Sequence, residues 1–177
     1  MKLLFFSGNS LRNRDFAFEA EAKLKDMFDA TYIQEYKHWQ TGQEWIDLPH
    51  ELEALKATSP NGEYAVFAKS IGIVLTVQAI AQNIIKPKFL LLCGIPLGYI
   101  VEEYPTFGQD LAEANIPLVI IHNDHDPVGA ATDVHEYLQK SLPNDPKHHF
   151  ITTVGNTHDY EDYTLLREQL KILQESV

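Results

Sequence analysis

Six short apolar runs alternate along the chain with longer segments in which apolar residues recur at helical spacing. The runs are Leu3 to Phe6, Thr31 to Tyr36, Tyr64 to Ala68, Phe89 to Cys93, Leu118 to His122 and His149 to Val154. Most of them are continuously apolar, which is typical of strands covered on both faces of a sheet. The pattern predicts an α/β protein, a three-layer α/β/α sandwich with a mostly parallel sheet of about six strands.

The segments between the runs differ in how much of their surface is apolar. Between the first two runs, Ala17, Ala20 and Leu24 recur at three- and four-residue steps with charged residues on the other face, which predicts an amphipathic helix. The segment from Ile71 to Ile85 is apolar on all sides, so a central, largely buried helix is expected there. No internal repeat or linker-like composition divides the sequence, and the 177 residues are expected to form a single domain.

Composition narrows the classes of partner. The chain carries 14 Lys and Arg against 25 Asp and Glu, a formal charge of -11 that would repel nucleic-acid phosphates and anionic lipid headgroups. Neither nucleic acid nor a membrane is therefore expected as a partner, and the oligomeric state cannot be predicted. Cys93 is the single cysteine and no stretch approaches the roughly 18 consecutive apolar residues of a membrane span, so a cytoplasmic protein is expected.

A serine follows the third apolar run directly and precedes the buried helix, in the segment Ala68-Lys69-Ser70-Ile71-Gly72. Small residues two before and two after a serine, between a strand and a helix, indicate a nucleophile elbow, because the sharp turn brings the two backbones close together. Such a turn exposes the hydroxyl and directs the N–H of Ile71 toward the same place, where the helix dipole favours negative charge. A serine that only caps the helix would also fit this short pattern.

A serine hydroxyl needs a histidine to accept its proton and a carboxylate to orient that histidine, and both follow downstream. The loop after the fifth run, His122-Asn123-Asp124-His125-Asp126-Pro127-Val128, places two carboxylates at the end of a strand, where parallel sheets carry their sites. The loop after the sixth run, Gly155-Asn156-Thr157-His158, supplies a histidine before the last helix. The order serine, aspartate, histidine is that of α/β-hydrolases rather than of chymotrypsin-like or subtilisin-like enzymes.

On these motifs the chain resembles the α/β-hydrolase superfamily over essentially its full length, and in particular small lidless bacterial lipases and compact intracellular serine hydrolases. Family members commonly carry Gly-x-Ser-x-Gly at the elbow, His-Gly-x-x-Asp-x-x-Val-Pro around the acid and Gly-x-x-His before the last helix. The resemblance implies a catalytic triad of Ser70, Asp126 and His158. It also implies a sheet without the first two strands of larger members, so that Leu3 to Phe6 corresponds to their third strand.

The same resemblance implies an oxyanion hole beside the serine. One donor would be the N–H of Ile71, and the second would come from the loop Ser7-Gly8-Asn9-Ser10-Leu11 after the first strand. Asn9 is favoured as that second donor, and Ser10 stays open.

Two departures from the family pattern leave questions. Lys69 stands where many relatives carry His, Gln or Tyr, and its cation is expected to reach solvent, while contact with an acidic group of a substrate stays open. Asn123 replaces the usual glycine and His125 lies beside Asp126, so that Asp124 stays open as the acid that orients the histidine.

The implied activity is that of a carboxylic ester hydrolase, a serine esterase that cleaves a small soluble ester by acyl transfer and needs no cofactor. Ile95, Leu97 and Tyr99, in the segment where larger relatives insert a lid, are expected to line a shallow acyl pocket. Thioesters, amides and lactones are open alternatives, because the same constellation cleaves them.

Two other classes of protein fit parts of the sequence. A catalytically silent α/β-hydrolase-like binding module would share the whole pattern and differ only in activity. A flavodoxin-like protein that binds FMN is the second, because Phe5-Phe6-Ser7-Gly8-Asn9-Ser10 resembles a phosphate-binding loop between a first strand and a first helix.

The remaining polar residues have simpler expectations. The imidazole and carboxylate groups of residues 122–126 would suit a metal ion, but no second ligand pair of characteristic spacing accompanies them, so no metal site is predicted. His38, His50 and His135 lie in polar segments and are expected to face solvent.

Overall fold

The computed structural model describes residues 1–58, 61–142 and 145–177, and within them six parallel strands form one sheet in the order β2-β1-β3-β4-β5-β6. The strands are β1 (Lys2–Phe6), β2 (Ala30–Ile33), β3 (Tyr64–Lys69), β4 (Leu90–Cys93), β5 (Leu118–Asn123) and β6 (His148–Thr153). Each strand overlaps one of the predicted apolar runs, and the predicted α/β class is confirmed.

The strand limits differ from the prediction at two informative places. The second strand ends at Ile33 rather than Tyr36, because Gln34 makes a last backbone hydrogen bond to the Phe5 carbonyl (3.0 Å) and Tyr36 then becomes the N-cap of the next helix. The third strand runs one residue beyond Ala68, so that Lys69 is still part of the sheet.

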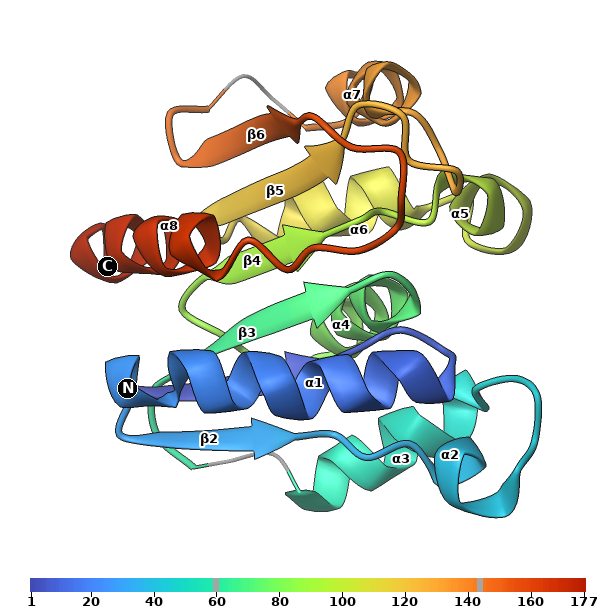
Figure 1. The fold of residues 1–177 in the computed structure, drawn as a ribbon, viewed down its shortest axis with the longest axis vertical. Coiled ribbons are helices and arrows are strands. Elements are labelled where there is room, and N and C mark those ends of the chain that lie inside the picture. The colour runs from blue at the N-terminus through green and yellow to red at the C-terminus, as the bar shows by residue number, and fades with distance from the viewer. Residues whose placement is uncertain (59–60, 143–144) are drawn as a thin grey trace.

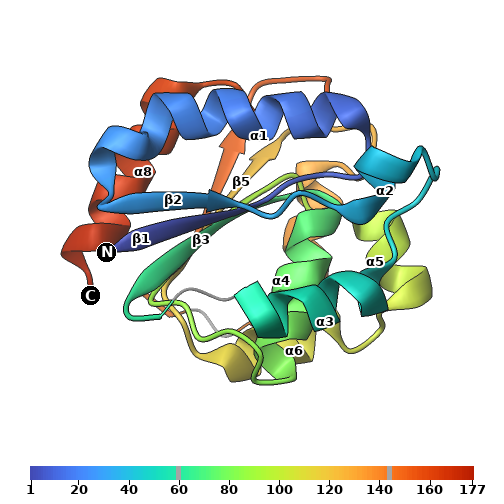
Figure 2. The same cartoon turned by 90° about the horizontal axis from the view of Figure 1, so that it is seen from below.

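Helices cover both faces of the sheet (Figure 1). One face carries α1 (Leu11–Leu24) and α8 (Tyr163–Glu175), and the other carries α3 (Leu48–Thr58), α4 (Ile71–Ala81), α6 (Phe107–Ala114) and α7 (Ala131–Gln139). The short elements are the 3-10 turn η1 (Lys25–Met27) and the helices α2 (Lys37–Thr41) and α5 (Leu97–Glu103). Figure 2 shows the three layers edge on, with the sheet between α1 and α8 on one side and the α3 and α4 layer on the other.

Side chains alternate along each strand and so supply two separate cores. In β4, Leu90 and Leu92 pack toward α4, whereas Leu91 and Cys93 pack toward α1 and α8. Because both alternating sets are buried, the strands read as continuous apolar runs in the sequence.

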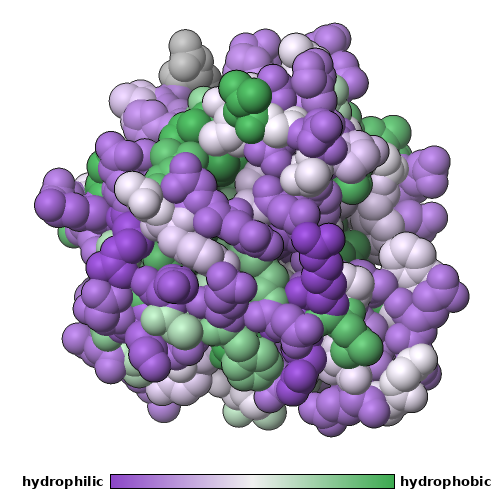
Figure 3. Space-filling view, in the orientation of Figure 1, coloured by the Kyte–Doolittle hydropathy of each residue, from purple (hydrophilic) through white to green (hydrophobic). Residues whose placement is uncertain are grey.

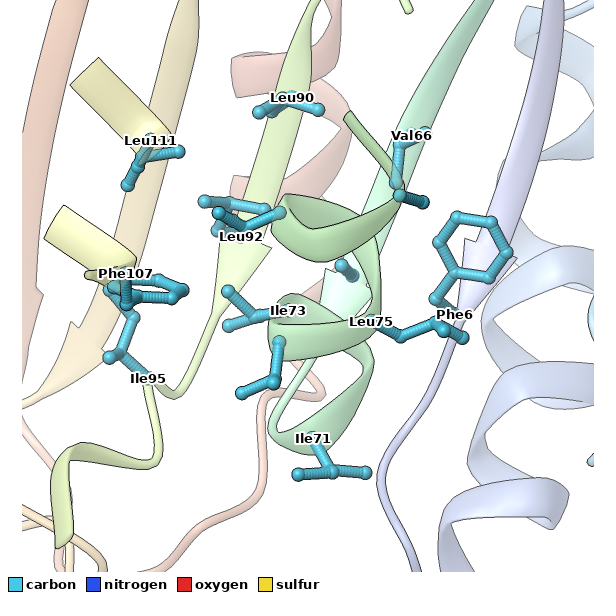
Figure 4. Close-up of a cluster of buried hydrophobic side chains, with 14 of the residues drawn as sticks. Phe6, Val66, Ile71, Ile73, Leu75, Leu90, Leu92, Ile95, Phe107 and Leu111 are labelled. Atoms are coloured by element: carbon cyan, nitrogen blue, oxygen red, sulfur yellow. The ribbon is translucent and has the colours of Figure 1, made fainter. Parts of the chain in front are cut away.

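The predicted central helix is α4, which is buried on nearly all sides but ends at Ala81 rather than Ile85. Figure 4 shows Ile73 directed toward the side of Leu92 and Phe107, and Leu75 directed toward Phe6. Contacts on both sides lock the helix against the sheet, and its N-terminus is thereby fixed at the end of β3.

Polar side chains set the starts of the two helices on the other face. Ser10 is the N-cap of α1, and its side chain accepts the N–H of Asn13. Asp162 caps α8 in the same way through the N–H of Leu165 (3.0 Å). These caps satisfy N–H groups that have no partner inside the helix, so each helix starts at a defined residue after its loop.

All strand arrows end at the same edge of the sheet, on the right in Figure 1, because the strands are parallel. The loops after β1, β3, β4, β5 and β6 therefore meet at this edge, which carries every residue of the predicted triad. The face formed by α1 and α8 is mainly hydrophilic, with hydrophobic side chains in small separate groups (Figure 3). Among the helices of the described ranges, none has the length and apolarity to cross a bilayer.

Candidate active site

Ser70 occupies a sharp turn between β3 and α4. Its backbone has φ 55° and ψ -128°, a conformation that costs a residue other than glycine on the order of 1–3 kcal/mol. Its N–H donates to the carbonyl of Cys93 (3.1 Å), and its carbonyl accepts the N–H of Ile73 (2.8 Å). The turn is thus fixed from both sides, and the serine side chain is half-buried at the sheet edge.

Gly72 allows α4 to pass directly over the end of β1. A Cβ at Gly72 would lie 2.2 Å from the carbonyl oxygen of Phe6 and 2.6 Å from that of Ser7. Any side chain would push the helix away from β1 and move the turn. On the other side of Ser70, Ala68 is completely buried in the core, so both small positions of the motif have a physical reason.

Asp126 and His158 meet at the ends of β5 and β6. His158 Nδ1 donates to Asp126 Oδ2 at 2.7 Å, and the same carboxylate accepts the Tyr160 hydroxyl (2.6 Å) and the N–H of Val128 (2.8 Å). Burial alone would raise the pKa of Asp126, but these three hydrogen bonds outweigh it and the pKa is lowered. The carboxylate therefore stays ionised and keeps the ring proton of His158 on Nδ1.

Asp124, the open alternative for the acid, has a different role. Its Oδ1 accepts the N–H groups of His125 (2.9 Å) and Gly155 (2.8 Å). The hydrogen bond from Gly155 also lowers the pKa of Asp124. Asp124 thus ties the acid loop (residues 124–130) to the histidine loop (residues 154–162), whereas the carboxylate that bonds to His158 is that of Asp126.

Asn123 explains one departure from the family motif. Its Nδ2 donates to the carbonyls of Thr157 (2.9 Å) and Asp159 (3.1 Å), the residues on either side of His158. Its Oδ1 accepts the hydroxyl of Thr153 (2.7 Å). The glycine that is usual at this position could make none of these bonds, so in this chain Asn123 clamps the histidine loop.

Gly94 brings Ser70 and His158 into one neighbourhood. It has φ 69°, and a Cβ there would lie 2.7 Å from His158 Cε1 and 2.5 Å from Tyr160 Cε2, so the imidazole rests against its backbone. Ser70 is hydrogen-bonded to the preceding residue, Cys93. Among the described residues nothing hydrogen-bonds His158 Nε2, so this nitrogen is free to accept a proton. The bond between the serine hydroxyl and this nitrogen is not formed here, and such bonds commonly tighten only when substrate binds.

Side chains of the α2 segment hold the candidate oxyanion loop (residues 7–10). The Tyr36 hydroxyl donates to the carbonyl of Ser7 (2.9 Å), and Trp39 Nε1 donates to the carbonyl of Asn9 (2.7 Å). His38 Nε2 lies 2.6 Å from the same Asn9 carbonyl and must carry a proton to bond to it. The expectation that His38 faces solvent is therefore wrong, because its ring is buried and satisfies a loop carbonyl.

The side chain of Asn9 extends this support outward. Its Nδ2 donates to the carbonyl of Glu44 (2.7 Å), and its Oδ1 accepts the N–H of Ile46 (2.8 Å), so Asn9 holds both neighbours of the exposed Trp45. Within the described ranges, the N–H groups of Asn9 and Ile71 donate to no other group. Both are available to a negatively charged oxygen, and the same holds for the N–H of Ser10.

His122 connects the acid loop to the loop after β4. Its Nδ1 accepts the N–H of Ile95 (3.2 Å) and its Nε2 donates to the carbonyl of Gly129 (2.7 Å). Burial lowers the pKa of His122, against a smaller opposing effect of the Gly129 bond. With both nitrogens engaged, His122 cannot act as a metal ligand in this arrangement. The described residues contain no group of three or more His, Cys, Asp or Glu that could hold a metal ion.

The predicted acyl pocket needs a correction. Ile95 is completely buried and belongs to the core beneath the site, so it supports the loop and is not accessible to a substrate. Leu97 and Tyr99, on α5, are half-buried and pack against the same core. Of the other histidines that were expected to face solvent, His50 and His135 are exposed.

Lys69 does not reach solvent as expected. The side chain is only 3% exposed, and its Nζ donates to Asn13 Oδ1 beneath α1. The cation lies in the layer between the sheet and α1, on the side of the sheet opposite to α4.

No family model and no curated protein matches this sequence, so the comparison with known proteins is structural. The chain superposes on an uncharacterised protein from Bacillus cereus with a TM-score of 0.76 and 18% identity, over 99% of this chain and 60% of that one. An α/β serine hydrolase homologue from Coxiella burnetii gives a TM-score of 0.69 and 16% identity over 100% and 85% of the two chains. A lidless α/β serine hydrolase from Xanthomonas campestris gives a TM-score of 0.63 and 14% identity over 99% of this chain and 81% of that one.

These superpositions show that the chain has the α/β-hydrolase fold. It spans only about 60% of the length of the Bacillus cereus protein. At identities below 20% the likeness concerns the arrangement of the backbone, and the chemistry has to be argued from the residues of this chain.

Proposed function

We propose that this chain is a serine hydrolase that cleaves small soluble carboxylic esters by acyl transfer, with Ser70, His158 and Asp126 as its catalytic triad. The hydrogen bond of 2.7 Å between His158 Nδ1 and the buried carboxylate of Asp126 carries the proposal. It forms at the same sheet edge as a serine whose backbone is held at φ 55°. The fold shared with the serine hydrolase homologue from Coxiella burnetii and the lidless serine hydrolase from Xanthomonas campestris supports it.

In the first half of the reaction, His158 Nε2 accepts the hydroxyl proton of Ser70 as the serine oxygen attacks the ester carbonyl carbon. Asp126 holds the other ring proton and stabilises the imidazolium that forms. The carbonyl oxygen becomes an oxyanion, which the N–H groups of Ile71 and Asn9 bind, each contributing roughly a factor of 10²–10³ in rate. The imidazolium then gives its proton to the departing alcohol, which leaves an acyl group on the serine.

In the second half, water replaces the alcohol. His158 takes a proton from the water as its oxygen attacks the acyl carbon, and the proton passes to the serine oxygen as the acid departs. The products are one alcohol and one carboxylic acid, and the enzyme returns to its starting protonation state.

A small soluble substrate agrees with the architecture around the site. The segment between β4 and β5, where larger relatives insert a lid, forms α5 and α6, and α6 packs against α4 in the core. The net charge of -11 disfavours an anionic lipid surface as the place of reaction. Leu97 and Tyr99 remain candidates to contact an acyl group from the rim.

Strand order alone does not exclude a flavodoxin-like protein, because the first five strands follow the order 2-1-3-4-5 of that fold as well. The turn at Ser70 and the Asp126–His158 pair have no role in FMN binding, and they favour the hydrolase. A silent binding module would keep the geometry without turnover.

Activity therefore tests the proposal. Purified protein would be assayed with p-nitrophenyl esters of two to ten carbons and with a matching thioester. The expected result is turnover that is fastest for the shortest esters and that is absent in Ser70→Ala, whose fold is checked by circular dichroism. Equal turnover by the variant, or none by the folded wild type on any member of the panel, would contradict the proposal.

A further inference from the structure

Lys69 is a buried cation next to the proposed nucleophile, and no step of the mechanism uses it. It is the last residue of β3 and is paired with Cys93 of β4. Its Nζ donates to Asn13 Oδ1 and lies 5.3 Å from the centre of the Phe16 ring. Burial lowers the pKa of Lys69. An ammonium group is costly to bury without a charged partner, so its place here calls for an explanation.

The groups around Lys69 do not form an ion pair with it. The charged and titratable side chains that face it come from four parts of the chain, namely Arg12, Asp15 and Glu19 of α1, Cys93 of β4, Asp126 of the acid loop, and Asp159 and Glu161 of the histidine loop. Asp159 is paired with Arg12 at 2.8 Å instead. Within the described residues, the hydrogen-bond partner of the Lys69 cation is therefore the neutral amide of Asn13.

Asn13 in turn contacts three residues of the oxyanion loop. Its Nδ2 donates to Ser10 Oγ (2.9 Å), and its backbone carbonyl accepts the hydroxyl of Ser7 (2.6 Å). Its amide lies against Gly8 so closely that a Cβ on Gly8 would be 2.5 Å from Asn13 Cγ. Because one end of an amide accepts and the other donates, a cation fixed on Oδ1 directs Nδ2 toward Ser10.

We propose that Lys69 is a positioning residue that couples the nucleophile turn to the oxyanion loop through Asn13, an inference that rests on the proposed function. The backbone of Lys69 carries Ser70 and Ile71, and its side chain fixes the amide that packs on residues 7–10. The two oxyanion donors, which belong to different loops, are thereby kept at a set separation. Donors of this kind must be placed within about 0.5 Å, and a misplacement of about 1 Å can cost on the order of 10²-fold in rate.

The test is a double-mutant cycle with Lys69→Met, Asn13→Ala and the double variant, assayed with p-nitrophenyl acetate. Lys56→Met is the matched control, because Lys56 is exposed on α3 and, in the part of the chain that the structure describes, forms its ion pair with Glu53 at the surface. We expect each single variant to lose roughly 10- to 100-fold in kcat with KM nearly unchanged, and the double variant to lose no more than the worse single variant. The control should keep wild-type activity.

A pH profile separates positioning from a purely structural role. Deprotonation of Lys69 weakens its bond to Asn13, so wild-type kcat should fall on the alkaline side and Lys69→Met should lack this fall. Asn13→Asp would give the cation a carboxylate partner, raise the pKa of Lys69 and move the fall to higher pH. Wild-type kcat and an unchanged pH profile in Lys69→Met would overturn the proposal, as would losses that simply add in the double variant.

The test still decides the proposal if Lys69→Met does not fold or if the wild type has no esterase activity. If Lys69→Met does not fold, Asn13→Ala and the alkaline shift in Asn13→Asp still decide the outcome, because Asn13 lies at the partly exposed start of α1. If the wild type hydrolyses no ester, the proposed function fails separately from the coupling. In that case amide NMR signals of residues 8–10 decide it, since coupling requires them to shift in Lys69→Met but not in Lys56→Met.

Discussion

The two halves of the candidate site are built from different parts of the chain. The acid–base half, Asp126 and His158, is supported mainly by residues of the same stretch, such as Asn123, Asp124 and Tyr160. The oxyanion half is supported from outside its own loop, by α1, by the end of β3 and by the α2 segment. The acid–base half can therefore be recognised from local sequence motifs. The oxyanion half depends on side chains from separate parts of the sequence, which belong to no common motif.

The largest difference in kcat should appear between variants of the two aspartates of the acid loop. We expect Asp126→Ala to lose about 10⁴-fold in kcat, because His158 loses the partner that orients it. Asp124→Ala is the matched control in the same loop and should stay within about tenfold of wild type, since it loses hydrogen bonds from the backbone N–H groups of His125 and Gly155 but none to His158. Steady-state kinetics on one ester would measure both, and an equal loss in the two variants would contradict the assignment of the acid.

Replacing residues that support the oxyanion loop should lower kcat less than Asp126→Ala does, although these residues lie outside the loop itself. A His38→Phe, Trp39→Phe double variant leaves the partly buried Asn9 carbonyl without its two donors, so that the loop should shift to satisfy it. We expect a loss of about 10- to 100-fold in kcat with little change in KM.

The control for this prediction is His50→Phe, because His50 is exposed and belongs to α3. Full activity in the His38 and Trp39 double variant, with its fold intact, would show that the α2 segment does not position the oxyanion donors.

The smallest effect concerns stability rather than rate. Burial lowers the pKa of His122 below its usual value of 6.5, so the unfolded chain takes up this proton at a higher pH than the folded protein does. Its contribution to stability is complete above about pH 6.5 and falls as the pH drops below that value. Between pH 7.5 and 5.5, the melting temperature of wild type should fall by a few degrees more than that of His122→Gln. His50→Gln is the control, and an identical slope in His122→Gln and wild type would contradict the assignment.

The fold could be predicted because its signals are local. The four central strands β1, β3, β4 and β5 are short apolar runs that are buried on both faces, and α4 is apolar all round because it lies between the sheet and α6. The order of Ser70, Asp126 and His158 after the third, fifth and sixth strands was likewise visible in the sequence. The structure brings Asp126 and His158 into contact and places Ser70 at the same edge.

The parts that could not be predicted depend on contacts between distant residues. The expectation that Lys69 reaches solvent was wrong because β3 is one residue longer than its apolar run, which places this side chain between the sheet and α1. His38 lies in a polar segment, and nothing in that segment shows that its ring will meet the Asn9 carbonyl. The choice between Asp124 and Asp126 likewise depends on where the N–H of Gly155 lies in space.

The most direct test of the central claim is to find which residue reacts with a fluorophosphonate, since the reagent bonds only to a serine that has been activated. Labelled protein would be digested, and the modified residue would be located by tandem mass spectrometry. We predict a single adduct on Ser70 that forms in wild type and in Asp124→Ala and that is absent from Ser70→Ala and His158→Ala. An adduct on another serine, or labelling that persists in His158→Ala at the wild-type rate, would contradict the account.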